Sequence, residues 1–368
     1  MRFFIAILGI MSVFWWAAPA GAEERRIDTP LGPALIETVA EEFRVPWSLG
    51  FLPDGRMLVT ERAGRLWLLA PDGTREQVSG LPDIAARGQG GLLDIAIARD
   101  FEQSSTVFLS FAKAQRDGEG TALAVAKLDE NRLRDLRVIF EMAPGSSGGQ
   151  HFGGRIVEAP DGTLFLTIGD RGDRPSAQDR ARHNGSVIRV TRDGDVPSDN
   201  PFAGQSDAQP EIWSYGHRNP QGATLDSEGQ LWVNEHGARG GDEINRVRRG
   251  ANYGWPVIAY GRHYSGGKIG EGTSKPGMEQ PEFYWDPSIA PSGMVIHSGN
   301  GWPAARGHHF VGSLKFDHVA VLTPGAEEEV GRIESRETAR VRDLREGPDG
   351  ALWIVSEGNG TIYRLRPE

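Results

Sequence analysis

One phrase recurs along the chain: an aliphatic residue, an acidic-glycine turn, and then a stretch in which hydrophobic and polar residues alternate. Its copies are FLPDGRMLVTERAGRLWLL, EAPDGTLFLTIGDRG, LDSEGQLWVNEHG and EGPDGALWIVSEGNGTIYRL, at residues 51–69, 158–172, 225–237 and 346–365. An acidic-glycine turn between two short alternating runs is the signal of a β-hairpin. The phrase therefore predicts a chain built from repeated antiparallel hairpins.

The spacing of the turns indicates how many units there are. The turn glycines Gly55, Gly162, Gly229 and Gly350 stand 107, 67 and 121 residues apart, which fits one or two units of roughly 55–60 residues per gap and about six units in all. Repeated four-stranded units without intervening helices favour radial closure, which leaves few free sheet edges. We predict an all-β fold, a six-bladed β-propeller with four-stranded antiparallel blades; a β-sandwich would not explain the repeat. The last strands should close the ring against a strand near residues 34–39.

The first 22 residues have the pattern of a secretory signal peptide. Arg2 precedes an apolar run over residues 3–18, and small residues follow at Ala20-Gly21-Ala22. We expect cleavage before Glu23, a periplasmic or secreted protein without a membrane anchor, and one catalytic domain over residues 23–368. The absence of cysteine excludes disulfides and thiolate metal sites, and the net charge of −10 argues against nucleic acid as a partner.

Long polar stretches separate the strand-like runs, and we expect them to be loops that gather around the central channel. They cover residues 80–91, 173–202, 238–253 and 260–280.

His151 is the first candidate for chemistry. It lies between glycine pairs, Gly148-Gly149 and Gly153-Gly154, which let the backbone approach a ligand closely. A histidine titrates near neutral pH and suits a general base. The alternative is a hydrogen-bonded structural histidine in a turn.

Two segments further on combine cationic, amide and acidic groups. Arg218, Asn219 and Gln221 offer donors for a carboxylate or an oxyanion, although Asn-Pro turn chemistry alone explains such a loop. Carboxylates in the glycine-rich run at residues 234–245 suit calcium, and a solvated acidic turn is equally compatible. A zinc site from His151, His217 and His236 stays open, without a supporting histidine spacing.

Cations collect near the end of the chain, at Lys315, Arg340 and Arg342. The two arginines share one face of a strand because they are two residues apart. These cations either form a solvated face of the strand or line a binding site for a small polyanion.

Five segments in this order resemble the soluble quinoprotein glucose dehydrogenases, and in particular their aldose sugar dehydrogenase branch. The matching segments are residues 88–94, 151–155, 214–222, 234–245 and 252–256. The resemblance implies a six-bladed propeller that uses pyrroloquinoline quinone (PQQ) and Ca²⁺ to oxidise an aldose at its anomeric carbon to the lactone, as hydride passes to the quinone.

The resemblance also implies a role for individual residues. His151 would be the base, with Arg218 beside the quinone oxygen, and Gln150 and Trp285 would contact the sugar. The cofactor would be held by Gln89, Arg218, Asn219, Lys315, Arg340 and Arg342. Backbone carbonyls of Gly237 and Ala238 would hold the active-site calcium, and Glu243 with the Tyr253 carbonyl a second, structural calcium.

Two positions depart from the family pattern. Ala238 stands where members often have proline, which makes the calcium loop less rigid, and Gln150 stands where glucose-specific relatives have aspartate. The second change favours a broader or different choice of sugar. The long insertions that build a dimer contact in those relatives have no counterpart, so we expect a monomer; the electron acceptor is not specified by the sequence.

Two other functions compete with this one. A calcium-dependent propeller lactonase or esterase would not need Arg218, Lys315, Arg340 and Arg342 together. A non-catalytic carbohydrate-binding propeller would not need His151 in a glycine-rich approach.

Overall fold

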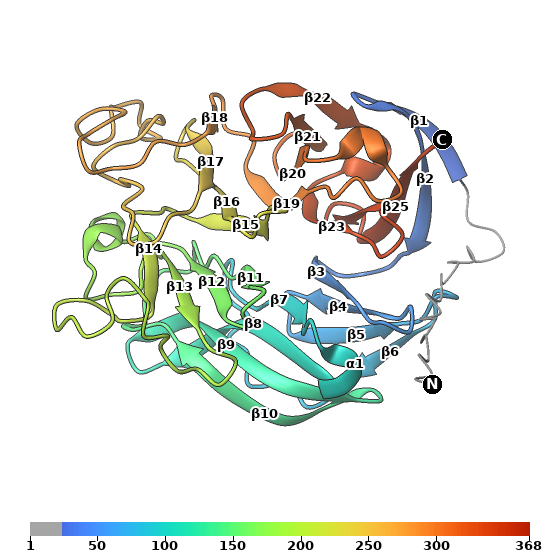
Figure 1. Ribbon diagram of the computed structural model, residues 1–368, viewed down its shortest axis with the longest axis horizontal. Helices are drawn as coiled ribbons and strands as arrows, with labels where there is room; N and C mark the ends of the chain where they lie inside the picture. Colours follow the sequence, from blue (N-terminus) through green and yellow to red (C-terminus); the bar gives the residue numbers. More distant parts are fainter. Residues whose placement is uncertain (1–23) are drawn as a thin grey trace, which may run out of the picture.

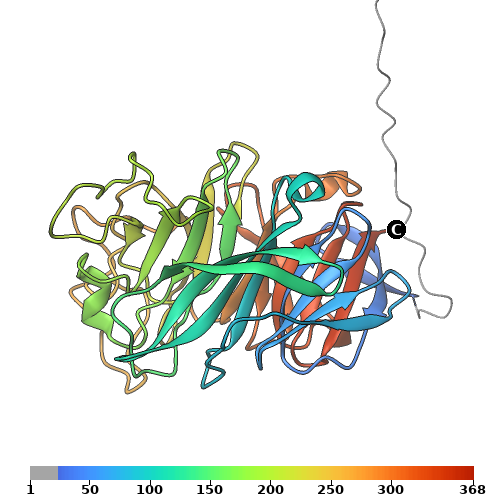
Figure 2. The same ribbon diagram turned by 90° about the horizontal axis from the view of Figure 1, so that it is seen from below.

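Six antiparallel sheets stand around a central axis in the computed structural model, which describes residues 24–368 (Figure 1). The predicted signal peptide lies outside the described residues. Each sheet runs from one strand near the centre of the ring to an outer strand in Figure 1, and Figure 2 shows the molecule as a flattened disc. The predicted six-bladed propeller is confirmed.

The first three blades follow the chain in order. Blade one contains β3 (Pro46–Phe51), β4 (Met57–Glu61), β5 (Arg65–Leu69) and β6 (Arg75–Val78). Blade two contains β7 (Leu92–Ile97), β8 (Thr106–Gln115), β9 (Gly118–Asp129) and β10 (Arg132–Glu141), with the short helix α1 (Phe101–Ser104) between its first two strands. Blade three contains β11 (Ile156–Glu158), β12 (Leu164–Ile168), β13 (Ser186–Val190) and β14 (Ile212–Tyr215), with the 3-10 helix η1 (Arg174–Gln178).

The remaining blades complete the ring. Blade four contains β15 (Pro220–Leu225), β16 (Leu231–Glu235), β17 (Asp242–Arg246) and β18 (Phe283–Trp285). Blade five contains β19 (Pro291–Ile296), β20 (His309–Ser313), β21 (His318–Leu322) and β22 (Glu329–Glu334), with η2 (Pro303–Ala305). Blade six contains β23 (Val341–Glu346), β24 (Leu352–Ser356), β25 (Thr361–Pro367), β2 (Gly32–Ala40) and β1 (Glu24–Thr29), and η3 (Arg336–Thr338) precedes it.

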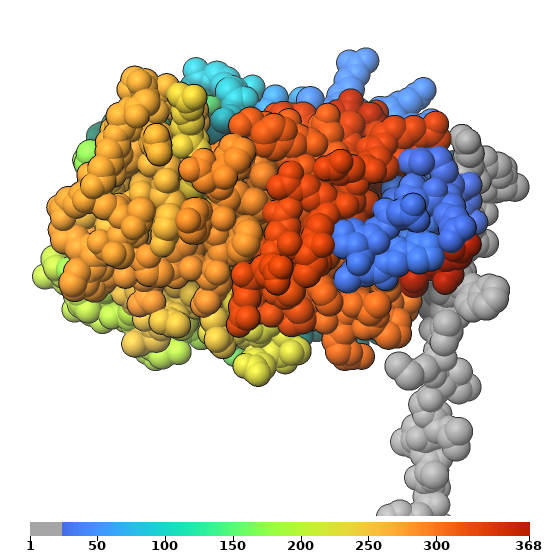
Figure 3. Space-filling view, turned by 90° about the horizontal axis from the view of Figure 1, so that it is seen from above, coloured from blue at the N-terminus to red at the C-terminus, as the bar shows by residue number. Residues whose placement is uncertain are grey.

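The two ends of the described chain close the ring in blade six. β2 pairs with β25, as expected, and β1 adds a fifth strand outside β2. Figure 3 shows this N-terminal segment, in blue, lying against the C-terminal strands, in red. The expected four strands per blade hold in the other five blades.

The turn glycines explain the unequal spacing of the recurring phrase. Gly55, Gly162, Gly229 and Gly350 have φ between +75° and +87°, a left-handed conformation that glycine adopts without strain, and each joins the first two strands of its blade. Blades two and five lack the phrase because α1 and the segment at residues 297–308 occupy the corresponding positions. The long gaps between glycines therefore span two blades each.

Two stretches predicted to be loops contain strands, so that expectation was wrong. The stretch at residues 173–202 includes β13, and residues 238–253 include β17. The sequence of β17, DEINR, hides its alternation because Asp242 and Asn245 are polar and nevertheless buried, at 1% and 0% exposure. Hydrogen bonds engage both carboxylate oxygens of Asp242 and the amide nitrogen of Asn245, so polarity did not signal solvent here.

A buried ion network joins the inner strands under the central cavity. The Arg155 guanidinium contacts Asp94 and Asp343 at 3.0 Å each, and Arg345 contacts the same two carboxylates at 2.6 and 2.9 Å. Burial alone would raise the pKa of Asp94, but Arg155 and Arg345 outweigh it and hold that pKa below its usual range. Arg155 also lies 4.5 Å from the centre of the Trp47 ring. The network therefore supports the cavity floor.

Candidate functional site

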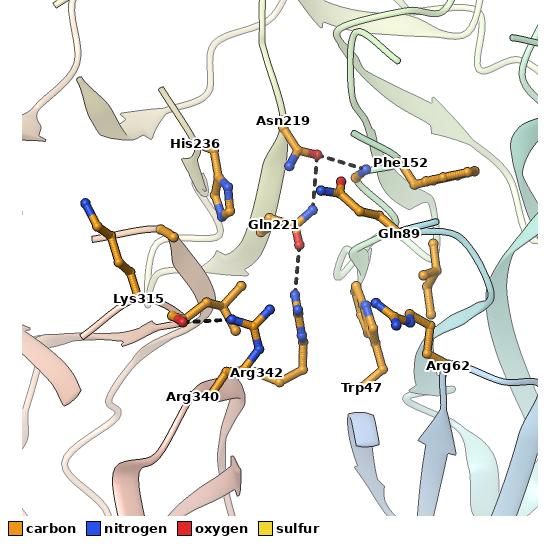
Figure 4. A pocket seen from close by; sticks show the side chains of 14 residues that line it. Trp47, Arg62, Gln89, Phe152, Asn219, Gln221, His236, Lys315, Arg340 and Arg342 are labelled. Carbon is orange, nitrogen blue, oxygen red and sulfur yellow. Dashed lines mark hydrogen bonds between the residues drawn. The ribbon is translucent and has the colours of Figure 1, made fainter. Parts of the chain in front are cut away.

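A cavity of about 460 Å³ opens at the centre of the ring, where the inner strands meet (Figure 4). Its lining contains four cationic side chains and no acidic one among the described residues. The lining residues are Trp47, Arg62, Gln89, Leu93, Phe152, Gly153, Asn219, Gln221, His236, Ala290, Leu314, Lys315, Arg340 and Arg342. All the cofactor residues expected from the sequence, except Arg218, therefore meet here.

The two arginines of blade six are oriented by one carboxylate. Nε of Arg340 donates to Glu357 at 2.7 Å and Nε of Arg342 donates to its other oxygen at 2.8 Å. Although burial opposes it, Arg342 and Arg340 hold the pKa of Glu357 below its usual value. Arg342 also donates to Gln221 Oε1 at 3.2 Å. Because one carboxylate compensates two guanidinium groups, the pair keeps excess positive charge for a ligand.

Amide side chains line the opposite wall. Gln89 Oε1 accepts the His151 backbone N–H at 2.8 Å, and Asn219 Oδ1 accepts from Gly153 N–H at 3.3 Å and from Gln221 at 3.1 Å. These oxygens are occupied, which fixes the amide groups in the cavity wall.

Close passage of two loops explains the glycines around Gln89 and His151. The Gln89 N–H donates to the Gly149 carbonyl at 2.8 Å, and a Cβ on Gly88 would lie 2.2 Å from that same oxygen. Only glycine permits this approach, which brings the loop before blade two onto the loop that carries His151 before blade three.

A second cavity of about 380 Å³ adjoins the first and shares Gln89 and His236 with it. It brings together the expected base, the expected cation beside it and the expected sugar contact. Its lining residues are Gln89, Gln150, His151, Asp170, Gly172, Arg174, Arg218, His236 and Tyr264.

His151 forms a hydrogen-bonded pair with Asp170. Its Nδ1–H donates to Asp170 Oδ1 at 2.6 Å, so Nε2 carries the lone pair. The same carboxylate accepts from Gly172 N–H at 2.7 Å and from Trp255 Nε1 at 2.8 Å. Three donors on a buried carboxylate hold it rigidly and ionised.

The electrostatics of this pair suit a base at neutral pH. Burial lowers the pKa of His151, and the nearby Arg218 lowers it further, while the hydrogen bond to Asp170 opposes both. Burial opposes ionisation of Asp170, yet His151 and the other donors hold its pKa below the usual value. A neutral imidazole facing a cavity and backed by an ionised carboxylate can accept a proton.

Arg218 is held by its backbone from two directions. Its N–H donates to Glu235 Oε2 at 2.6 Å, and its carbonyl accepts the Asp170 N–H at 2.8 Å. Its guanidinium donates to the His236 carbonyl at 3.2 Å, while Nε has no hydrogen-bond partner among residues 24–368. Arg218 also lines the second cavity, which brings its cationic side chain within reach of an anionic group there.

A buried chain of hydrogen-bonded side chains supports the backbone of Arg218. Glu235 Oε1 accepts from His217 Nδ1 at 2.7 Å, and Ser214 Oγ lies 2.9 Å from His217 Nε2. All three side chains are at most 4% exposed. Both His217 nitrogens are thus engaged, and residues 24–368 contain no group of three or more His, Cys, Asp or Glu side chains placed to hold a metal. The zinc alternative is therefore wrong.

The loop at Gly237 and Ala238 is organised by Asp242. Its Oδ1 accepts from Gly237 N–H at 2.8 Å and from Ser288 Oγ at 2.9 Å, and its Oδ2 accepts from Ala290 N–H at 2.7 Å. This use of the carboxylate leaves backbone carbonyls as the oxygens that the loop offers. Carbonyl oxygens are ligands that Ca²⁺ accepts.

Glu243 and Glu235 form a crowded carboxylate pair next to this loop. Burial, followed by repulsion from Glu235, raises the pKa of Glu243 to about 8. Asn245 Nδ2 bridges the two, at 3.2 and 3.1 Å, and Tyr253 stacks on His217 with ring centres 4.5 Å apart. A cation at Glu243 would relieve the repulsion, so the donor chemistry fits calcium.

Trp285 lies apart from both cavities. It is 5% exposed, packs in the hydrophobic cluster between blades four and five, and donates its Nε1–H to Glu329 at 2.6 Å. The aromatic side chain that lines the second cavity is Tyr264, which is 70% exposed.

Reasoning from sequence missed Arg62, Asp170 and Glu357. Asp170 had a signal, since it lies two residues after the alternating strand β12 in one of the recurring phrases. Arg62 and Glu357 directly follow β4 and β24. Nothing in their spacing tells which strand ends share a face of the ring.

Comparison with known proteins places the chain among sugar dehydrogenases. The model of the glucose/sorbosone dehydrogenase family matches residues 43–364. The chain is 42% identical over 377 residues to aldose sugar dehydrogenase YliI of Escherichia coli (strain K12), covering 99% of this chain and 98% of that protein.

Solved structures give the same result. The soluble aldose sugar dehydrogenase from Escherichia coli in its apo form superposes with a TM-score of 0.88 at 41% identity, covering 90% of this chain and 99% of that one. The PQQ-bound form of aldose sugar dehydrogenase from Streptomyces coelicolor superposes with a TM-score of 0.75 at 26% identity, covering 95% and 99%. Among the described residues, no helix has the length and apolar character needed to cross a membrane.

Proposed function

The chain belongs to the glucose/sorbosone dehydrogenase family, and we propose that it is a PQQ- and calcium-dependent enzyme that oxidises aldoses at the anomeric carbon to lactones. The observation that carries this proposal is the adjacency of two cavities. One is lined by four cations and no described acid, and the other holds the His151–Asp170 pair.

The first cavity fits a polyanionic planar cofactor. Lys315, Arg340 and Arg342 would bind carboxylates, and Gln89 and Asn219 would orient the ring system. The guanidinium of Arg218, a residue that lines the adjoining second cavity, would lie beside a quinone oxygen. When bound, PQQ supplies the acceptor for the hydride that leaves the sugar, and Ca²⁺ beside it supplies Lewis acidity.

The protein's own contribution is proton transfer and orientation. His151 Nε2 would accept the proton of the anomeric hydroxyl, and the Asp170 carboxylate would stabilise the resulting imidazolium at Nδ1. Gln150, which lines the same cavity, would contact the sugar. Trp285 does not line this cavity, so it would support the site through packing and not by contact with the sugar.

Calcium would bind at two places in blade four. The carbonyls of Gly237 and Ala238 would hold the ion of the active site, and Glu243 with the Tyr253 carbonyl would hold a structural ion. Two observations support this assignment. The pKa of Glu243 is raised, in part by repulsion that a cation would relieve, and Asp242 accepts the Gly237 N–H, which leaves the carbonyl oxygens of that loop for a cation.

We further propose that the protein is exported, acts as a monomer and passes electrons to an acceptor outside the cytoplasm. A lactonase or esterase is less well supported, since ester hydrolysis gives no role to four cations around a cavity that no described acid lines.

Reconstitution tests the proposal. Purified apo-protein should gain dye-reducing activity with a panel of aldoses only when both PQQ and Ca²⁺ are added. Absence of quinone binding, together with no sugar-dependent dye reduction, would remove the dehydrogenase assignment.

A further inference from the structure

Arg62 is a cation of the first cavity to which the resemblance gives no role. It follows β4 in the turn that leads to β5, and its backbone is fixed on both sides. Its N–H donates to the Val45 carbonyl at 3.1 Å, and its carbonyl accepts the Leu92 N–H at 3.0 Å. The side chain therefore starts from an anchored position.

The guanidinium of Arg62 has no hydrogen bond, ion pair or ring contact with any residue in the described part of the chain, 24–368. The other cations of the cavity have protein acceptors. Lys315 donates to the Ser288 carbonyl at 3.2 Å, and Arg340 and Arg342 share Glu357. Arg62 is partly buried and carries a charge that the protein does not compensate.

The direction of the side chain is favourable. Figure 4 shows Arg62 reaching into the cavity on the side of Trp47, across from the wall that carries Lys315. Arg62 is also close enough to Arg342 to contribute to its electrostatics: burial lowers the pKa of Arg342, Glu357 opposes this, and repulsion by Arg340 and Arg62 adds smaller lowering contributions. Two like charges facing one cavity are costly unless an anion lies between them.

The charge balance matches a tri-anion. Four cations line the cavity, and Glu357 compensates one charge, which leaves three. PQQ carries three carboxylates. Without Arg62, the cavity would hold two uncompensated charges.

We propose that Arg62 binds a carboxylate of the cofactor, on the blade-one side of the cavity, as a further binding residue for the tricarboxylate. This proposal rests on the proposed function. Arg62 lines the first cavity and His151 the second, so Arg62 takes no part in proton transfer.

The test measures affinity for PQQ and not turnover. Apo-protein is titrated with PQQ, and with its trimethyl ester, by quenching of tryptophan fluorescence in Ca²⁺ buffer. Arg62→Ala should weaken PQQ binding roughly 10- to 100-fold, the range for one charge-assisted interaction, and leave ester binding unchanged. Arg62→Lys should give an intermediate loss, because it keeps the charge but loses the planar pair of donors.

Arg65→Ala is the matched control. It lies on the same hairpin, pairs with Glu61 and does not line the cavity, so it should leave both affinities unchanged. An unchanged PQQ affinity in Arg62→Ala, or an equal loss for PQQ and its ester, would overturn the proposal. Failure of the unsubstituted protein to bind PQQ would overturn the proposed function, and this inference with it.

Discussion

The substitution Asp170→Asn tests whether the Asp170 carboxylate positions His151 or is only a buried structural group. The native carboxylate accepts three N–H donors, from His151 Nδ1 at 2.6 Å, Gly172 N at 2.7 Å and Trp255 Nε1 at 2.8 Å. The amide of asparagine has one oxygen and one NH₂ group. His151 and Gly172 share Oδ1 and Trp255 uses Oδ2, so in one amide orientation the Trp255 N–H faces the NH₂ group and in the other the Gly172 N–H does, whichever tautomer His151 adopts.

The expected loss follows from these contacts. If the amide nitrogen faces His151, Nδ1 must become the acceptor, and Nε2 then carries a proton and cannot act as base. We expect kcat to fall by about 10² to 10⁴, the contribution of a general base. Because Asp170 raises the pKa of His151 against burial, its loss should also shift the acidic limb of the pH–rate profile to lower pH.

The assay is the pH dependence of kcat for reconstituted enzyme, with cofactor occupancy measured in the same samples. Asp173→Asn is the control, since this exposed acid lies in the same loop and, within residues 24–368, its side chain pairs only with Arg182. Full occupancy with an unchanged kcat, or a limb that moves to higher pH, would refute the reasoning.

Three further predictions follow from the same network. His151→Gln should keep PQQ affinity but lower kcat by about 10² or more; unchanged turnover would exclude His151 as base. Glu235→Gln should lower kcat about 10-fold with little change in KM, because one amide oxygen cannot accept from both Arg218 N–H and His217 Nδ1–H. Rescue of kcat by Glu235→Asp, or a change in KM alone, would count against a positioning role for Glu235. Without metal, the folded protein should lose stability as pH rises from about 4.5 to about 8, because folded Glu243 retains a proton that the unfolded chain has lost. Glu243→Gln should flatten this decline and reduce the stabilisation by Ca²⁺. A melting temperature that is unaffected by Ca²⁺ in both proteins would contradict the structural site.

The fold was predictable because its determinants are local. A positive-φ glycine in the turn and two alternating runs define a hairpin, and four such hairpins at unequal spacing implied the blades between them. The fifth strand of blade six was not predictable, since β1 alternates no more clearly than a polar segment. β17 was missed because its buried polar residues make hydrogen bonds that no pattern reveals.

The site was predictable only in part, because it is assembled from strand ends far apart in sequence. Gln89, Asn219, Lys315, Arg340 and Arg342 were named through family resemblance, and the cavity brings them together. Asp170 escaped because its role depends on a distance of 2.6 Å to His151, set by two loops and not by spacing. Arg62 escaped because its significance lies in lacking a partner, which is visible only once its neighbours are placed.

Anaerobic titration of the PQQ- and Ca²⁺-loaded protein with an aldose tests the central claim most directly. The absorption spectrum of the cofactor should convert fully from the oxidised to the reduced form at one sugar per site, with one lactone formed for each cofactor reduced. A loaded protein whose cofactor spectrum stays oxidised with every aldose of the panel would contradict the account.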